Sequence, residues 1–270
     1  MLNIPSQYFF YGVFFFMLEI PFINKKLFVV TDIHGNLQDF NDYLNLWLMD
    51  KSNHIVFTGD LIHHDEKSKD KSLEILDLVR VYNRYSTFHV LLGNHELSQL
   101  LGENVYRYHI NQCEQFRELV EEKYPNNPTV KYEEYKNILR GFDYYVGTSN
   151  GLLISHTGFH EDYIEYIIND SINIHHINLN NSFEKKIITE HLWARPYDDY
   201  TEQTINQILN YTNKKYLISG HTNYNGCHII GNQLIFDSSH NTETKYYLEI
   251  QLNKKYENII EILKQLNKKK

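Results

Sequence analysis

The stretch IVFTGDLIHHD, residues 55–65, has the form of a buried strand that ends in a polar loop. The same form occurs in KLFVVTDIHG, residues 26–35, and in FHVLLGNHE, residues 88–96. Apolar residues at helical spacing follow each loop and predict helices at 36–48, at 69–83 and from residue 94 onward. Three such units in succession predict an α/β layered fold with mostly parallel central strands. In such folds, sites form at the carboxyl ends of the strands.

The rest of the chain predicts one domain with a helical insertion. Residues 104–140 are polar and aromatic with helical periodicity, which is typical of an insertion or a cap. Hairpins are expected around Ser149–Gly151 and Gly231–Asn232, because these turn-forming residues separate apolar runs. The final segment from Tyr256 has the pattern of a helix. No internal repeat or linker divides the sequence, so a single domain is favoured.

The N-terminal segment is strongly apolar. YFFYGVFFFML, residues 8–18, is interrupted soon afterwards by Glu19 and Pro21, and it is shorter than the about 20 residues that cross a bilayer. It also lacks the basic start of a secretory signal. A loosely packed extension, a shallow membrane anchor through residues 8–18, and a later start at Met17 all remain open. We expect residues 1–22 to form an extension and residues 23–270 to form the domain.

The overall charge and the cysteines exclude some classes of protein. The formal net charge is -8, and the only basic run is Lys268–Lys270, so a nucleic-acid backbone is not an expected partner. A phosphorylated ligand remains possible, because a bound metal can supply positive charge locally. Cys113 and Cys227 lie far apart and outside any CxxC spacing. This predicts neither a disulfide framework nor a thiolate zinc site, and it indicates a reducing, cytoplasmic compartment.

Oxygen and imidazole ligands follow the predicted strands one after another. They are Asp32, His34, Asp60, Asn94, His95, His156 and His221. Carboxylate, imidazole and amide groups together suit Mn, Fe or Zn. A central carboxylate can bridge two ions about 3.5–4 Å apart, which clamps the attacking and leaving oxygens in phosphoester hydrolysis. Singly, His34 could bond the backbone at a helix entry, and Asn94 could be an ordinary helix N-cap.

Five motifs occur in a fixed order along the chain. They are DIHG (32–35), GD (59–60), GNHE (93–96), HTG (156–158) and GHT (220–222). In this order they resemble the calcineurin-like metallophosphoesterases. LWARP, residues 192–196, and the DxHG and GNHE forms are closest to the phosphoprotein-phosphatase branch, which contains serine/threonine phosphatases, and to its bacterial-type and dinucleoside-tetraphosphatase relatives. The resemblance covers about residues 26 to 252 and implies a layered α/β/β/α sandwich with a helical insertion.

The resemblance also implies a role for each ligand. The first ion would be held by Asp32, His34 and Asp60. The second would be held by Asp60, Asn94, His156 and His221, with Asp60 bridging. His95 would donate a proton to the leaving oxygen, and a hydroxide shared by the two ions would attack phosphorus. Mn²⁺ is the ion expected to support activity in vitro.

The loop after Asp60 departs from the GDxVDRG pattern of the phosphoprotein-phosphatase branch. His63 stands where an aspartate usually orients the catalytic histidine, and His64 stands where an arginine usually grips phosphate. Asp65 replaces the final glycine, and Thr31 replaces a glycine before the first motif. His63 could still accept a hydrogen bond from His95 as a neutral ring. The change could encode a slower enzyme, a different substrate or an acidic optimum.

Substrate contacts are expected from Arg195, His64, His63 and Asn94. A histidine offers one donor and a charge that fades near neutral pH, whereas arginine offers a permanent charge and a two-pronged donor. Arg195 is therefore the candidate to replace the missing grip, unless it forms a structural salt bridge with Asp198 or Asp199. Asp237 is expected to be a turn residue. The histidines expected to be ordinary core or surface residues are His89, His175, His176 and His228.

Three functions remain open from the sequence. The leading one is a dimetal phosphoesterase acting on phosphomonoesters of phosphorylated proteins or small molecules, most simply a serine/threonine-type protein phosphatase. The second is a dinucleoside polyphosphate hydrolase, in which residues 104–140 would cover a base. The third is a non-catalytic phosphate-binding homologue, in which His63-His64-Asp65 marks lost turnover.

Overall fold

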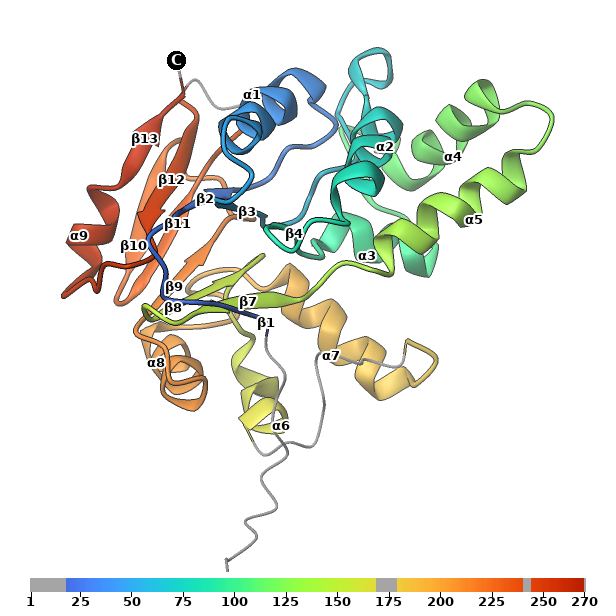
Figure 1. Cartoon of the computed structure of the whole chain (residues 1–270). Coiled ribbons are helices and arrows are strands. Elements are labelled where there is room, and N and C mark those ends of the chain that lie inside the picture. The colour runs from blue at the N-terminus through green and yellow to red at the C-terminus, as the bar shows by residue number, and fades with distance from the viewer. Residues whose placement is uncertain (1–17, 169–178, 240–243, 270) are drawn as a thin grey trace, which may run out of the picture.

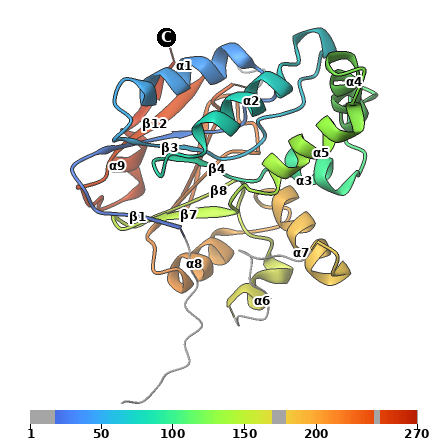
Figure 2. The ribbon, with the colours of Figure 1, turned by 45° about the vertical axis from the view of Figure 1, so that its right-hand side comes forward.

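Two β-sheets face each other at the centre of the molecule, and helices cover the outer face of each (Figures 1 and 2). The computed structural model describes residues 18–168, 179–239 and 244–269. The order of layers is helix, sheet, sheet, helix, which confirms the predicted α/β/β/α sandwich. Within the described ranges, no helix is long and apolar enough to cross a membrane.

The first sheet contains the three predicted strand–loop–helix units. Its strands run in the order β13 (Leu266–Lys268), β12 (Tyr246–Gln251), β2 (Lys26–Val30), β3 (His54–Phe57) and β4 (Phe88–Val90). Strands β2, β3 and β4 are parallel, and β12 runs antiparallel to β2. The helices that follow the three parallel strands are α1 (Leu37–Leu48), α2 (Ser72–Tyr82) and α3 (Asn94–Leu101). A short 3-10 turn, Lys67–Lys69, precedes α2, which therefore begins three residues later than predicted.

The second sheet contains both predicted hairpins. Its strands run in the order β1 (Leu18–Ile20), β7 (Tyr145–Thr148), β8 (Leu152–Ser155), β9 (Tyr216–Ser219), β11 (Gln233–Phe236) and β10 (Cys227–Ile230). The pairs β7–β8 and β10–β11 are antiparallel, with turns at the expected positions. Strand β1 pairs with β7. Residues 18–20 of the predicted extension therefore belong to the sheet, and residues 1–17 lie outside the described ranges.

The alternation of side chains along each strand builds three hydrophobic cores. In β2, Phe28 and Val30 face the helices of the first sheet, whereas Leu27 and Val29 face the second sheet. Because successive side chains of a strand point to opposite faces, an unbroken apolar strand is buried on both sides. A third core lies between the second sheet and its helices, which are α6 (Ile164–Ile168), α7 (Ser182–Trp193) and α8 (Glu202–Tyr211).

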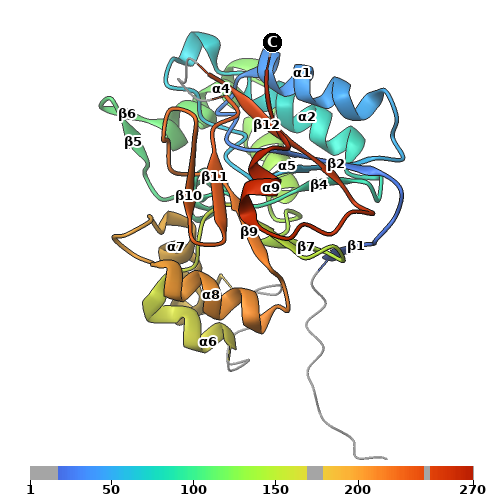
Figure 3. The same cartoon turned by 90° about the vertical axis from the view of Figure 1, so that its left-hand side faces the viewer.

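The insertion at 104–140 is helical, as expected, but it begins with a hairpin. Helices α4 (Gln112–Lys123) and α5 (Pro128–Leu139) pack against the first helical layer through Phe116, Val120 and Leu139. Before them, β5 (Tyr106–Arg107) pairs with β6 (Ile110–Asn111) in a two-stranded sheet that projects to the upper left in Figure 3. The sequence did not predict this hairpin.

The C-terminal segment is less helical than predicted. The structure has one short helix, α9 (Ile259–Leu263), and then β13 at the edge of the first sheet. The apolar residues after Tyr256 are too few for a long helix. The residues after α9 instead form β13, which pairs with β12.

Candidate active site

The loops after β2 and β3 are tied together at the carboxyl ends of the strands. The carbonyl oxygen of Asp60 accepts hydrogen bonds from the backbone N–H groups of Ile33, at 2.9 Å, and His34, at 2.8 Å. Asp60 and His34 have φ values of 50° and 47°. Residues other than glycine rarely adopt this left-handed conformation, and they do so mainly where the surroundings hold them for function.

A buried carboxylate fixes the Asp60 loop to the start of α3. Glu96 accepts backbone hydrogen bonds from Asp60 at 2.8 Å, Leu61 at 2.7 Å and Gly93 at 3.0 Å. Glu96 belongs to the GNHE motif, but the motif did not predict this role for it. The available signal was its place three residues after the helix N-cap, where a glutamate commonly reaches back to the backbone.

Four ligand atoms converge where both sheets present their strand ends. Asn94 Oδ1 lies 2.9 Å from His156 Nε2 and 3.0 Å from His221 Nδ1. The two ring nitrogens are 3.1 Å apart, and Asp60 Oδ1 is 3.6 Å from His156 Nε2. His156 Nδ1 faces the carbonyl oxygen of Thr58 at 3.0 Å and donates to it, so its Nε2 presents a lone pair.

The Asn94 oxygen, the His156 Nε2 lone pair and the Asp60 carboxylate face one another in a buried space, where acceptors are stabilised by a shared positive charge. A cation supplies it and suits the amide oxygen, imidazoles and carboxylate. The other way to satisfy these groups is to turn the Asn94 amide, so that its NH2 donates to His156, His221 and Asp60. The donor set therefore fits a divalent ion. Asp60, His156 and His221 together form a group that could hold a metal.

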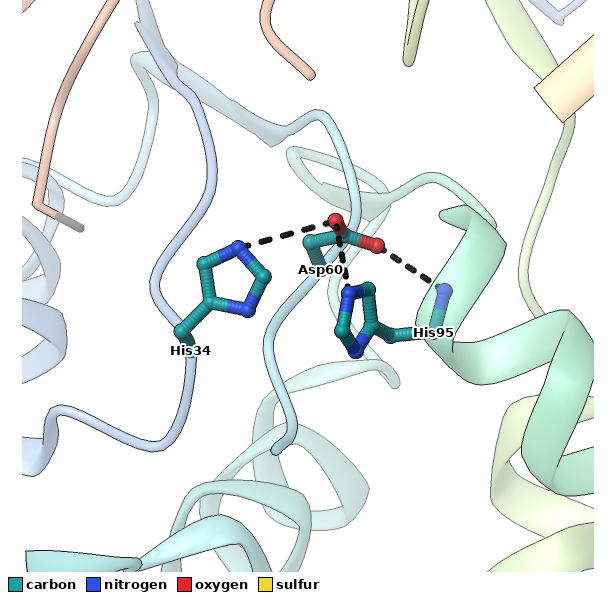
Figure 4. A group of neighbouring side chains, drawn as sticks. All are labelled: His34, Asp60 and His95. Atoms are coloured by element: carbon teal, nitrogen blue, oxygen red, sulfur yellow. Dashed lines mark hydrogen bonds and ion pairs between the residues drawn. The ribbon is translucent and has the colours of Figure 1, made fainter. Parts of the chain in front are cut away.

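A second group gathers at the other oxygen of the Asp60 carboxylate, Oδ2, and Figure 4 shows it. His34 Nε2 is 3.7 Å and His95 Nε2 is 3.9 Å from Asp60 Oδ2, and these three residues could also hold a metal. The backbone N–H of His95 donates to Asp60 Oδ1 at 3.1 Å. The structure thus brings His95, predicted as the proton donor, as close to Asp60 as the predicted ligand His34.

Asp32 contacts the group that contains His156 and His221. Its Oδ2 accepts a hydrogen bond from the His221 backbone N–H at 2.7 Å, and its Oδ1 is 3.8 Å from His156 Nδ1. Oδ1 has no hydrogen-bond partner among the described residues. Burial raises the pKa of Asp32 to about 7, with the Asp60 charge adding to the rise. A nearby cation would favour the ionised carboxylate instead, as expected for a ligand.

The predicted contact between His63 and His95 is present. Their Nδ1 atoms are 3.0 Å apart, and His63 Nε2 is 2.9 Å from Gln99 Oε1. The Gln99 NH2 donates to the Tyr132 hydroxyl at 2.6 Å, which leaves its oxygen facing His63. His63 therefore carries its proton on Nε2 and accepts from His95 through Nδ1. Burial lowers the pKa of His63 to about 4, consistent with a neutral acceptor.

A cavity of about 440 Å³ lies over these groups. Its floor includes His34, Asp60, Asn94 and His95. Its other lining residues include Val105, Tyr106, Arg107, Tyr108, Gln112, Trp193, Arg195 and His221. The cavity thus combines the candidate metal ligands with two arginines and three aromatic side chains.

Two of the four residues predicted to contact substrate line the cavity. Arg195 and Asn94 line the cavity, and the described lining residues do not include His63 or His64. His63 is fully buried beside His95, and His64 Nδ1 accepts from the Glu66 N–H at 3.0 Å. The Arg195 backbone N–H donates to Asp199 Oδ2 at 2.8 Å. Within the described ranges, no ion pair joins the Arg195 guanidinium to Asp198 or Asp199.

The residues that were expected to have ordinary structural roles have such roles in the described part of the chain. Asp237 accepts from the Gly226 N–H at 2.7 Å and closes a turn. His89 pairs with His54 in the interior at 3.1 Å, and His228 stacks on Tyr224 with ring centroids 4.3 Å apart. His175 and His176 lie outside the described residues.

Comparison with known proteins agrees with the fold and the order of the motifs. Among curated proteins, none matches this sequence. A Saccharomyces cerevisiae serine/threonine phosphatase similar to human PP5 shares 14% identity over 94% of this chain and 82% of its own, with a TM-score of 0.63. A cold-active protein-tyrosine phosphatase of a psychrophilic Shewanella shares 19% identity over 87% of this chain and 77% of its own, with a TM-score of 0.59. At these identities the likeness shows the fold alone.

The family assignment rests on the sequence itself. The family model for calcineurin-like phosphoesterases matches residues 25–224, which include the whole series of motifs from Asp32 to His221. The chain belongs to the calcineurin-like phosphoesterase family, whose members are phosphoric ester hydrolases.

Proposed function

We propose that this protein hydrolyses phosphomonoesters with two divalent ions held on either side of Asp60. The observation that carries the proposal is the convergence of potential ligand atoms from both sheets around that carboxylate. The first ion would be held by Asp32, His34 and Asp60. The ligands of the second ion would be Asp60, Asn94, His156 and His221. When bound, such ions supply positive charge for the phosphoryl oxygens and lower the pKa of water; Mn²⁺ is the ion to test first.

The protein's own groups would handle the proton. Hydrolysis breaks the bond from phosphorus to the leaving oxygen and forms one from phosphorus to a water oxygen. Because Nδ1 donates to His63, His95 Nε2 carries a proton only when the ring is charged. In that form, Nε2 would give this proton to the leaving oxygen at the cavity floor beside Asp60, and a water proton would replace it. The contact with His63 holds the ring with Nε2 directed into the cavity.

The proposed substrate class is a phosphorylated protein with phosphoserine or phosphothreonine, as the resemblance to the phosphoprotein-phosphatase branch suggests. The alternative, a dinucleoside polyphosphate, required residues 104–140 to cover a base. Of this segment, residues 105–108 and Gln112 line the cavity, whereas α5 packs against α2 and α3. The helices therefore give that alternative little support. The retained ligand set argues against a non-catalytic homologue.

Hydrolysis of p-nitrophenyl phosphate with added Mn²⁺ tests the proposal. His95→Ala should lower kcat by about 10²–10⁴-fold, the usual contribution of a positioned proton donor. His228→Ala is the control, because His228 lies outside the cavity lining. Absence of Mn²⁺-dependent turnover in the wild type, or equal turnover in His95→Ala, would refute the mechanism.

A substrate panel then separates the finer alternatives. Phosphoserine, phosphothreonine and phosphotyrosine peptides should be compared with diadenosine tetraphosphate at equal concentrations. Phosphotyrosine belongs in the panel because a protein of the same fold is a protein-tyrosine phosphatase. A preference for diadenosine tetraphosphate in kcat/KM would replace the protein-phosphatase proposal with the nucleotide one.

A further inference from the structure

The Asp60 loop does not deliver an arginine to the cavity. Position 64 holds a histidine, and its Nδ1 is engaged by the Glu66 backbone N–H. The described lining residues do not include His64. The charge that relatives place on this loop must therefore come from another part of the chain if the cavity is to bind a phosphoryl group.

The hairpin β5–β6 brings Arg107 to the cavity. Arg107 pairs with Ile110 at the end of the two strands, and Tyr108 and His109 make the turn. These two residues have φ values of 47° and 68°, the positive values at both central positions that define the tightest hairpin turns. The turn places Arg107 among the residues that line the cavity.

Asp65 holds this arginine. Arg107 Nε lies 2.9 Å from Asp65 Oδ1, with side chains 28% and 11% exposed. Asp65 occupies the position where the GDxVDRG pattern ends in glycine, directly after His64.

We propose that Arg107 binds the phosphoryl group of the substrate and that Asp65 is a positioning residue that holds Arg107 at the cavity. The inference rests on the proposed function and adds a phosphate contact to the same site. Arg195, from the segment after α7, lines the cavity as well, so two guanidinium groups from separate segments would share the phosphoryl oxygens.

The chemistry of arginine explains why Arg107 on the hairpin is paired with Asp65 in the loop. A guanidinium offers donors in a fixed fork that matches phosphate oxygens. On a projecting hairpin such a long side chain loses conformational entropy on binding, and this weakens affinity unless the side chain is already held. An ion pair at Nε provides that restraint. A glycine at position 65 would leave the hairpin arginine without this partner.

The competing explanation is that the Arg107–Asp65 pair only docks the hairpin. A docking pair would change stability but not the affinity for phosphate. The experiment that separates the two explanations measures the Kd of inorganic phosphate by calorimetry on the Mn²⁺-loaded protein, together with KM and kcat for p-nitrophenyl phosphate. Thermal melting of each variant reports stability separately.

Arg107→Ala should weaken phosphate binding and raise KM by about 10- to 100-fold, as expected for loss of a charged hydrogen bond. Arg107→Lys should recover only part of the affinity, since lysine keeps the charge but not the fork. Arg84→Ala, an exposed arginine outside the cavity lining, is the matched control and should bind phosphate normally. Unchanged Kd and KM in Arg107→Ala would overturn the inference.

Asp65→Asn tests the positioning role. It should weaken phosphate binding by less than Arg107→Ala does, and the effect should vanish when Arg107 is already alanine, because the two residues act as a unit. An unchanged Kd in Asp65→Asn, or an equal effect in both backgrounds, would overturn that role. If Arg107→Ala does not fold, Arg107→Lys and Asp65→Asn decide the question.

The two proposals fail in different ways. If the wild type turns over substrate and Arg107→Ala has the same KM and Kd, the phosphoesterase proposal stands and the role of Arg107 is wrong. If the wild type binds phosphate through Arg107 but hydrolyses nothing, the role of Arg107 stands and the catalytic proposal is wrong.

Discussion

Asp60 lies at the centre of the site, and its backbone C=O, backbone N–H and carboxylate all contact other residues of the site. Its carbonyl oxygen holds the loop after β2, and its N–H is bonded to Glu96. With the backbone fixed in this way, the carboxylate faces a histidine group on each side. Burial and the nearby Glu96 charge raise the pKa of Asp60 well above its usual value. Cations in the two groups would favour the ionised form that a bridging ligand requires.

Gly93→Ala provides a test of this arrangement that removes no ligand. A Cβ at position 93 would lie 2.2 Å from Asp60 Oδ1 and 2.7 Å from Glu96 Oε2. Both carboxylates must shift, so we expect Mn²⁺ affinity to fall by about 10-fold or more and stability to fall by about 1–3 kcal/mol. Calorimetric titration with Mn²⁺ and urea unfolding measure the two effects.

The control for this change is Gly141→Ala, at an exposed glycine that is not among the cavity-lining residues. There the nearest atom to a new Cβ is the Ile138 carbonyl oxygen, at 3.3 Å. Wild-type Mn²⁺ affinity in Gly93→Ala would show that the Asp60 carboxylate is not held as described.

The positions of the candidate ligands were easier to predict from the sequence than those of the residues that support them. Asp32, Asp60 and Asn94 could be predicted because each follows an apolar strand, and parallel strands align their carboxyl ends. Gln99 and Arg107 could not be predicted in this way. Their roles depend on which side chains meet across segments, such as His63 with Gln99 and Asp65 with Arg107.

Among the elements, long periodic segments were predictable and short ones were not. Helices α1 and α2 carry apolar residues at helical spacing through about three turns, so their positions were close to the prediction. Strands β5 and β6 have two residues each, and their turn lacks the Asn-Gly signal of a hairpin. At the C-terminus, β13 exists because it pairs with β12, a long-range contact that local periodicity does not contain.

Helix α1 is tied to the C-terminal region through one buried carboxylate. Asp39 pairs with Lys245 at 2.6 Å and also contacts Lys269 and the Ser239 hydroxyl. Burial acts to raise the pKa of Asp39, but the hydrogen bonds from both lysines and Ser239 outweigh it and lower the pKa. The ionised carboxylate thus stabilises the fold above the unfolded pKa. This stabilisation is lost as the pH falls through the folded value.

Asp39→Ala should therefore destabilise the protein by about 2–3 kcal/mol. This is below the loss for a fully buried pair, because both lysines are partly exposed. Asp42→Ala is the control on the same helix. Asp42 pairs with Lys269 at 2.7 Å but is 39% exposed, so its loss should cost less than about 1 kcal/mol. Urea unfolding at neutral pH measures both. Equal losses in the two variants would contradict the structural role of Asp39.

The whole molecule places its site where two sheets end together. Asp60 and Asn94 follow strands of the first sheet, whereas His156 and His221 follow β8 and β9 of the second. The layered architecture was predictable from the strand pattern and the family resemblance together. The pattern alone did not assign strands to two sheets, because strands buried on both faces look alike whichever partners they pair with.

This placement makes metal binding a property of the whole fold. An ion held by residues from both sheets binds the folded chain and loses its site when the sheets separate. At a free concentration about 100 times its Kd, Mn²⁺ should stabilise the protein by about 2.7 kcal/mol, and chelation should remove that gain. Thermal melts with Mn²⁺ and with EDTA measure the difference. His221→Ala should abolish most of it, whereas His228→Ala, outside the cavity lining, should retain it. An equal Mn²⁺ effect in His221→Ala and the wild type would mean that the ion does not join the two sheets.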